Sequence, residues 1–253
     1  MDHSLTTWLI LLVAAFLGGG LNAIAGGGSF FTFPALVYAG VPAVAANASG
    51  TLALLPGYFA STWGYREDLK PPATLTMGAV IAISLGGGAI GAALLLTTPD
   101  EMFRAIVPWL LLFATLLFAF GPWLLRMFSG NAREGEAGAW LQGCTLAMVS
   151  IYGGYFNGGL GIVLLAAFSL LGHSSINSMQ GLKNLVSSVL TAIAVSVYAF
   201  GGAILWKEAL VMMLAASVGG YFMARVGRKL PPAFVRAVVI VTGSVMTVLF
   251  FRS

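Results

Sequence analysis

Ten apolar segments follow one another along this chain, with almost no charge inside any of them. Of the 253 residues, 12 are Lys or Arg and 8 are Asp or Glu, a charged fraction of 8% where soluble domains carry about 25%. So few charges cannot cover a water-soluble globule of this size, and the mean hydropathy of +0.95 agrees. The pattern predicts an all-α integral membrane protein. It argues against a soluble enzyme, a secreted domain and a nucleic-acid binder.

Eight of the segments approach or exceed the ~20 helical residues that cross a hydrocarbon core of about 30 Å. They are 5–24, 43–64, 72–96, 103–127, 138–156, 174–200, 207–225 and 233–251. The two others, 29–40 and 159–172, each follow a glycine cluster and reach only about 18–21 Å. Each short segment is therefore either the second half of a broken helix or the return arm of a hairpin.

The positions of Lys and Arg distinguish these possibilities, because cytoplasmic loops carry the excess of basic residues. If each broken element crosses once, six basic residues oppose five, which decides nothing. If each broken element is a hairpin that enters the membrane and returns to the same side, three basic residues lie on one side: Arg104, Lys207 and Arg252. Eight lie on the other side: Arg66, Lys70, Arg126, Arg133, Arg225, Arg228, Lys229 and Arg236. The hairpin hypothesis is favoured. It puts both termini outside, on the side opposite the cytoplasm.

Each half then contains a hairpin and three crossings, an odd number, so the second half is inverted relative to the first. The segment 99–107 matches 231–239 at an offset of 132 residues, and 84–87 matches 217–220 at 133. The glycine clusters correspond at about 134. Inverted repeats with broken helices are typical of secondary transporters. We therefore predict a first membrane repeat at 1–127, a cytoplasmic linker at 128–137 and a second, inverted repeat at 138–253.

The two glycine clusters are the first candidate site, because each lies near mid-depth of its half and carries an Asn. A half-helix that starts after such a break points its N–H groups and its positive dipole end at the gap, which suits an anion. Close helix packing through small residues is the alternative reading, and the sequence leaves it open. The residues of this prediction are Asn22, Gly26, Gly27, Gly28, Ser29, Asn157, Gly158, Gly159 and Gly161.

Lys183 is the sharpest signal, because it lies about ten residues, or ~15 Å, into an apolar segment. A Lys at that depth costs at least ~2.5–3.5 kcal/mol and normally faces a cavity or a partner. Every Asp and Glu falls in a loop or at a segment end, so an anionic substrate is the expected partner; snorkelling to an interface is the alternative. We predict that the anion sits between the two glycine breaks and that Lys183 neutralises it. The polar residues expected to share this site are Gln180, Asn184, Asn47, Ser49 and Thr51.

Enzyme and cofactor signatures are missing from the sequence. There is no His-Glu-x-x-His, Gly-x-Ser-x-Gly or Walker motif. One Cys and two His are too few for the usual zinc sites. We predict no catalytic residue, no metal and no cofactor.

The stretch Gly20-Leu-Asn-Ala-Ile-Ala-Gly-Gly-Gly-Ser-Phe-Phe-Thr-Phe-Pro-Ala-Leu36, followed by Ala46-Asn-Ala-Ser-Gly-Thr51, resembles the sulfite exporter TauE/SafE family. Gly154-Tyr-Phe-Asn-Gly-Gly-Leu-Gly161 and Gln180-Gly-Leu-Lys-Asn184 are similar to its second-half signature, although members commonly have a fuller Gly-Gly-Gly run there. The resemblance covers essentially the whole chain. It implies transport of small anions such as sulfite, sulfoacetate or other organosulfonates across the bacterial inner membrane.

The sequence favours export by alternating access. With the cytoplasm negative, each exported negative charge gains ~2.3 kcal/mol per 100 mV, and no intramembrane carboxylate is available for conventional coupling. An anion channel using the same site and a proton- or Na⁺-coupled importer remain the alternatives. The expected partners are the anionic substrate and the lipid bilayer, with no nucleic acid. The sequence leaves the oligomeric state open.

Overall fold

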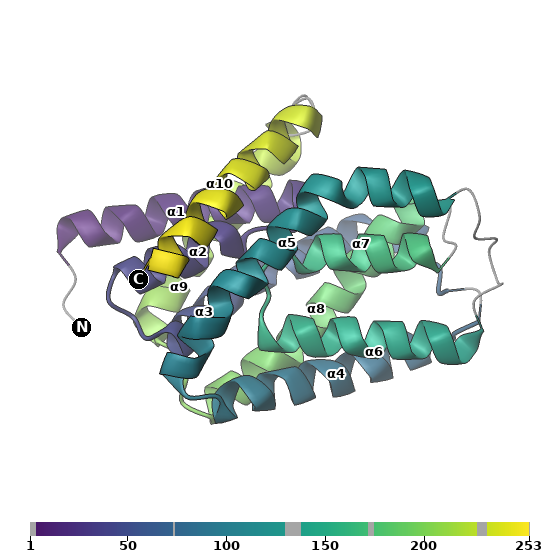
Figure 1. Ribbon diagram of the computed structural model, residues 1–253, viewed down its shortest axis with the longest axis horizontal. Helices are drawn as coiled ribbons and strands as arrows, with labels where there is room; N and C mark the ends of the chain where they lie inside the picture. The colour runs from purple at the N-terminus through teal and green to yellow at the C-terminus, as the bar shows by residue number, and fades with distance from the viewer. Residues whose placement is uncertain (1–3, 73, 130–137, 172–174, 227–231, 253) are drawn as a thin grey trace.

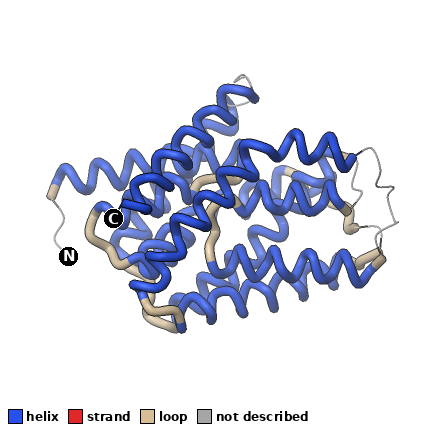
Figure 2. The backbone as a smooth tube through the Cα atoms, viewed as in Figure 1, coloured by secondary structure: helices blue, strands red, loops and turns tan. Residues whose placement is uncertain are grey.

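A computed structural model describes residues 4–72, 74–129, 138–171, 175–226 and 232–252 of the chain. These residues are almost entirely helical, and they contain no strand (Figure 2). The all-α prediction is therefore confirmed for the described part of the chain. Residues 130–137, most of the predicted linker, lie outside it.

Ten α-helices and one 3₁₀ turn make up the described part (Figure 1). The α-helices are α1 (Leu5–Ala25), α2 (Ser29–Tyr38), α3 (Ala43–Gly64), α4 (Met77–Thr97), α5 (Asp100–Ser129), α6 (Ala139–Tyr155), α7 (Leu160–Leu170), α8 (Ile176–Phe200), α9 (Trp206–Val226) and α10 (Pro232–Arg252), and the 3₁₀ turn is η1 (Arg66–Asp68). Each α-helix corresponds to one predicted segment, and α2 and α7 are the two short ones. The largest difference is the start of α4, which was expected at residue 72.

Three helices in the described ranges are long and apolar enough to cross a membrane by length and hydropathy: Leu5–Ala25, Met77–Thr97 and Asn177–Phe200. Ser29–Tyr38, Leu160–Ser169 and Ile240–Arg252 are shorter apolar helices. Large apolar side chains cover much of the outer surface, with Trp63, Trp109 and Phe200 each more than 60% exposed. Such a surface is unfavourable in water and suits a bilayer.

The chain turns back on itself at both glycine breaks. Gly26 ends α1 in the left-handed conformation (φ 76°), where a side chain is disfavoured. A Cβ on Gly18 would lie 2.9 Å from the Gly28 carbonyl oxygen and 3.0 Å from Thr32, so α2 runs back along α1. Gly159 (φ 72°) begins α7, which packs back along α6. The short segments are therefore return arms.

Helices pack in pairs that link the two halves of the chain. α1 lies against α9, α4 against α6, and α5 against α10, while α3 and α8 contact each other at the centre (Figure 1). Glycines allow the close approach: a Cβ on Gly19 would overlap the backbone of Ala216 in α9, and one on Gly91 would overlap Ile151 in α6. Small residues at such crossings are typical of helix packing in membranes.

The two ends of the molecule differ in which helix termini they hold. α1 begins and α10 ends at one end of the long axis, and α5 ends and α6 begins at the other (Figure 1). Lys207, at the start of α9, lies 5.5 Å from the Trp8 ring centre and so belongs to the first end. Thr74 donates to Gln142 of α6 (2.7 Å), which puts the α3–α4 connection at the second end.

Candidate functional site

The tips of the two glycine breaks touch each other in the interior. A Cβ on Gly26 would lie 2.9 Å from Gly161 Cα, and a Cβ on Gly161 would lie 2.9 Å from Gly26 Cα. Both glycines are buried. The two clusters that the sequence placed at similar depths are therefore in direct backbone contact, and no residue with a side chain could replace either glycine without moving the other break.

Backbone donors at both breaks have no hydrogen-bond acceptor within the described ranges. The neighbouring N–H groups of Phe30, Leu160 and Ile162 do donate, to carbonyls of Gly27, Asn157 and Gly159. The N–H groups without an acceptor are those of Gly27, Gly28, Ser29, Asn157, Gly158, Gly159 and Gly161. Buried N–H groups are normally paired, and an unpaired one in a membrane costs several kcal/mol. Such a group of donors is what an anion requires.

Carbonyl groups at the second break are, by contrast, already occupied. The Tyr198 hydroxyl donates to the Gly154 carbonyl, Asn47 Nδ2 donates to the Tyr155 carbonyl (3.2 Å), and the Tyr152 hydroxyl donates to the Gly158 carbonyl (2.6 Å). The first two bonds satisfy acceptors at the negative end of α6, and the third satisfies a carbonyl between α6 and α7. The second break therefore keeps free donors while three of its carbonyls are paired.

Two buried asparagines flank the breaks, and each has a polar atom without a partner. Asn22 is 6% exposed and Asn157 is 2% exposed. Among the described residues, Asn22 Oδ1 has no donor and Asn157 Nδ2 has no acceptor. Asn157 Oδ1 accepts from the Tyr58 hydroxyl at 3.0 Å. Tyr58 was not among the predicted site residues.

On α3, the predicted polar residues divide between two faces. Asn47, Thr51 and Tyr58 are spaced four and seven residues apart and share one face. Thr51 is buried, and its Oγ1 has no partner within the described ranges. Ser49 points away from this face: its Oγ accepts from the Leu205 N–H (2.9 Å), just before α9 begins.

On α8, the predicted polar residues share one face, which spans about 100° at 3.6 residues per turn. Ser187 and Thr191 extend it, and neither hydroxyl oxygen has a partner among the residues that the structure describes. On one side of this face, Ser188 Oγ lies 2.7 Å from Thr62 Oγ1 of α3. On the other side, Leu190 lies against Gly153 beside the second break. The other residues of the face are Gln180, Lys183 and Asn184.

Lys183 is 3% exposed and makes no hydrogen bond or ion pair with another described residue. It precedes Leu190, which marks the depth of the second break, by seven residues or about 10 Å along α8. The structure thus puts Lys183 about two turns from the break tips, on the face that leads to them. We had predicted that Lys183 would neutralise an anion bound between the breaks themselves.

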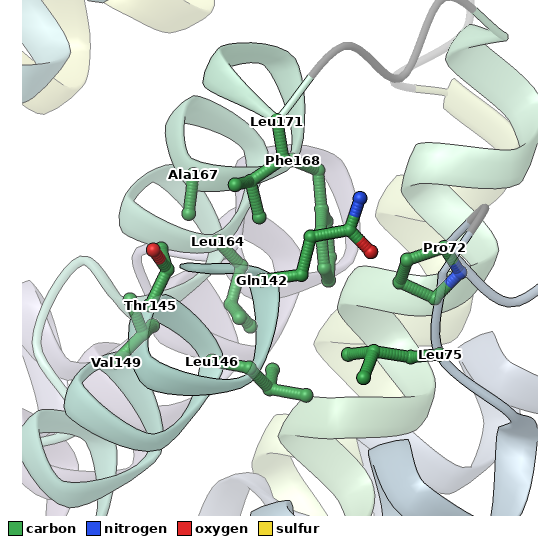
Figure 3. A pocket seen from close by; sticks show the side chains of 10 residues that line it. All are labelled: Pro72, Leu75, Gln142, Thr145, Leu146, Val149, Leu164, Ala167, Phe168 and Leu171. Atoms are coloured by element: carbon green, nitrogen blue, oxygen red, sulfur yellow. The ribbon is translucent and has the colours of Figure 1, made fainter. Parts of the chain in front are cut away.

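A pocket lies elsewhere, at the end of the molecule where α6 begins (Figure 3). Pro72, Leu75, Gln142 and Phe168 are among its lining residues, and apolar side chains dominate. It has room for about one water molecule. Because it lacks a charged residue, we assign the polar region at the breaks, and not this pocket, as the candidate site. No group of His, Cys, Asp and Glu able to hold a metal ion occurs among the residues searched, which are the described ones.

Known proteins resemble this chain over nearly its whole length. The profile of the family described as "Sulfite exporter TauE/SafE" matches residues 11–250. The "Probable membrane transporter protein ORF9" of a Sinorhizobium species is 30% identical over 241 residues, covering 89% of this chain and 87% of the relative. A "Probable membrane transporter protein" of Haemophilus influenzae is 26% identical, covering 98% and 95%. "Probable membrane transporter protein YfcA" of Escherichia coli K12 is 24% identical, covering 94% and 87%.

No solved structure matches the chain. The family match nevertheless spans both glycine breaks, α3 and α8, the elements that hold the candidate site. The chain belongs to the sulfite exporter TauE/SafE family and is a membrane transporter.

Proposed function

We propose that the protein is a secondary transporter that exports small anions, sulfite or organosulfonates, across the bacterial inner membrane by alternating access. One observation carries the proposal: two glycine breaks meet in the interior with seven N–H donors that have no acceptor among the described residues. An anion bound there accepts these bonds and needs no countercharge at the tips.

The proposal includes two inverted repeats, 1–127 and 138–253, joined by a cytoplasmic linker at 128–137. The pairing of helices supports it, because exchanging the halves maps several of the contacts onto one another: α1–α9 onto α6–α4, α3–α9 onto α8–α4, and α2–α10 onto α7–α5. The left-handed glycines at the two breaks also correspond, since Gly26 and Gly159 are 133 residues apart. In this arrangement, one bundle moves against the other around the contact between the breaks.

Lys183 supplies the charge that attracts the anion. At an effective dielectric constant of about 20, two unit charges ~10 Å apart still interact by roughly 1.7 kcal/mol. That energy raises the local anion concentration without holding the ion permanently. Ser187 and Thr191 provide hydroxyl groups between Lys183 and the break tips. We therefore assign Lys183 to the approach route and the breaks to the central position.

Orientation and direction follow from charge. The proposal puts both termini in the periplasm, and it puts Arg66 and Lys70, which lie in the α3–α4 connection, in the cytoplasm. With a cytoplasm that is negative by 100 mV, each exported negative charge gains ~2.3 kcal/mol. Export then needs no coupled ion.

Sulfite efflux from proteoliposomes at set K⁺/valinomycin potentials tests this function, with and without Na⁺ and pH gradients. We expect efflux that saturates with internal sulfite, grows as the interior becomes more negative, and persists without either gradient. Flux that does not saturate and shows no counterflow would indicate a channel. Flux that collapses without Na⁺ or a pH gradient would indicate a coupled transporter. No flux of sulfite, organosulfonates or carboxylates would refute the proposal.

A further inference from the structure

Tyr58 lies where α3 passes both glycine breaks. Its hydroxyl donates to Asn157 Oδ1 at 3.0 Å, and its side chain is 2% exposed. On the same stretch of α3, a Cβ on Gly57 would lie 3.7 Å from Asn22 Nδ2. One turn of α3 therefore contacts the asparagine of each break.

The hydrogen bond from Tyr58 determines what Asn157 can offer a ligand. An amide has one acceptor oxygen and one donor nitrogen, and its orientation is set by whichever partner binds one of them. Because Oδ1 accepts from Tyr58, the free group is Nδ2, which is buried and has no acceptor in the described part of the chain. The backbone N–H of Asn157 is also free, and so are those of the next two residues, Gly158 and Gly159. The side chain and the backbone of this segment therefore offer donors together.

Without the Tyr58 hydroxyl, the amide of Asn157 has no fixed orientation. If it rotates by 180°, its oxygen takes the place of Nδ2 and faces the donors at the break. An acceptor there competes with a bound anion for the same N–H groups and repels it. The hydroxyl thus affects anion affinity although it need not touch the anion.

We propose that Tyr58 is a positioning residue that holds the Asn157 amide with Nδ2 as a donor to the transported anion. The inference rests on the proposed function, because it assigns a further residue to the same site. It predicts that affinity for oxyanions depends on the Tyr58 hydroxyl through Asn157.

The test compares Tyr58→Phe, Asn157→Ala and the double variant in the sulfite efflux assay, with thermal unfolding in detergent measured in parallel. We expect Tyr58→Phe to raise KM about tenfold, as the loss of one hydrogen bond to an anion would, with little change in maximal flux. Asn157→Ala raises KM at least as much. The double variant is no worse than Asn157→Ala alone, because Tyr58 acts through Asn157.

Thr74→Val is the matched control, because the Thr74 hydroxyl also donates to the oxygen of a buried amide, Gln142 Oε1 (2.7 Å), but at the end of the molecule where α6 begins, away from the breaks. We expect it to leave KM within twofold of wild type. An equal rise of KM in Thr74→Val and Tyr58→Phe would mean a general effect of losing such a hydrogen bond and would overturn the inference.

An unchanged KM in Tyr58→Phe, or additive effects in the double variant, would also overturn it. If Tyr58→Phe does not fold, Asn157→Ala decides the question. An unchanged KM in that variant would show that Asn157 Nδ2 is not a donor to the anion and would overturn the inference. Failure of the proposed function is recognised separately, because the wild-type protein itself would then carry no sulfite.

Discussion

Replacing Gly26 by alanine tests whether contact between the two breaks matters. Gly26 has φ 76°, and a Cβ there would lie 2.9 Å from Gly161 Cα. Gly40→Ala is a matched control, because Gly40 also has a positive φ (84°) but a Cβ there would have no heavy atom within 4 Å. The two substitutions share the backbone cost and differ in the clash alone.

The expected magnitudes follow from these two terms. A non-glycine residue in the left-handed region costs about 1–2 kcal/mol, which applies to both variants. At Gly26 the clash involves backbone, so one break must shift by a few tenths of an ångström, and overpacking of this kind costs about 1–3 kcal/mol more. We therefore expect a total of about 2–5 kcal/mol for Gly26→Ala.

Thermal unfolding in detergent and sulfite efflux from proteoliposomes measure both consequences. Gly40→Ala should unfold slightly earlier than wild type and transport normally. Gly26→Ala should unfold earlier still, and the molecules that remain folded should have a raised KM, because the shift separates the two sets of donors. If the two variants were equally stable and equally active, the contact between the breaks would have no role in binding, and the reasoning would be refuted.

Three further substitutions have expected outcomes that the same assays check. Lys183→Gln should lower efflux at low internal sulfite, because it removes the buried charge that attracts the anion, whereas Lys207→Gln, at an exposed position, should leave efflux unchanged; equal effects would contradict the assignment of Lys183. Thr191→Val should leave the unfolding temperature unchanged or raise it, because the Thr191 hydroxyl has no protein partner, while KM for sulfite rises; a drop in stability would indicate a structural role. Gly91→Ala should cost about 1–3 kcal/mol through overlap with α6, and Gly86→Ala, where a Cβ meets nothing, less than ~0.5 kcal/mol; similar costs would contradict close packing of α4 on α6.

Most of the fold could be predicted because apolar segments in a membrane protein are interrupted only where the helices end. The start of α4 is the instructive difference. Residues 72–76 are apolar enough to extend the segment, but Thr76 caps α4 by accepting from the Ala79 N–H at 3.2 Å, so the helix begins after it. A hydropathy profile does not register such a cap, whereas a Thr just before a helical segment is a known signal for one.

The candidate site was predicted less completely, and two of the reasons concern helix α3. Ser49 was grouped with Asn47 and Thr51, but a shift of two residues rotates a side chain by about 200°, to the opposite face of the helix. Tyr58 was missed because an aromatic residue in an apolar segment looks like packing, although its eleven-residue spacing from Asn47 puts both on one face. A helical-face analysis of α3 would have corrected both.

The depth of Lys183 could not be derived from the sequence in the same way. Counting from the start of its segment gives a depth in the membrane, but its distance from the breaks depends on how far α8 slides along α6 and α7. The contact of Leu190 with Gly153 fixes that register, and it arises from packing between segments far apart in the chain. Only the structure could supply it.

The central claim is that an anion binds where the two breaks meet, and a structure determined with selenite, a heavier analogue of sulfite, tests it most directly. Anomalous scattering from selenium would locate the ion without reference to the surrounding chain. We predict a peak within hydrogen-bonding distance of N–H groups from both 27–29 and 157–161, with Asn157 Nδ2 facing it. A peak held by Lys183 alone, or in the pocket between α6 and α7, with none at the breaks, would contradict the account.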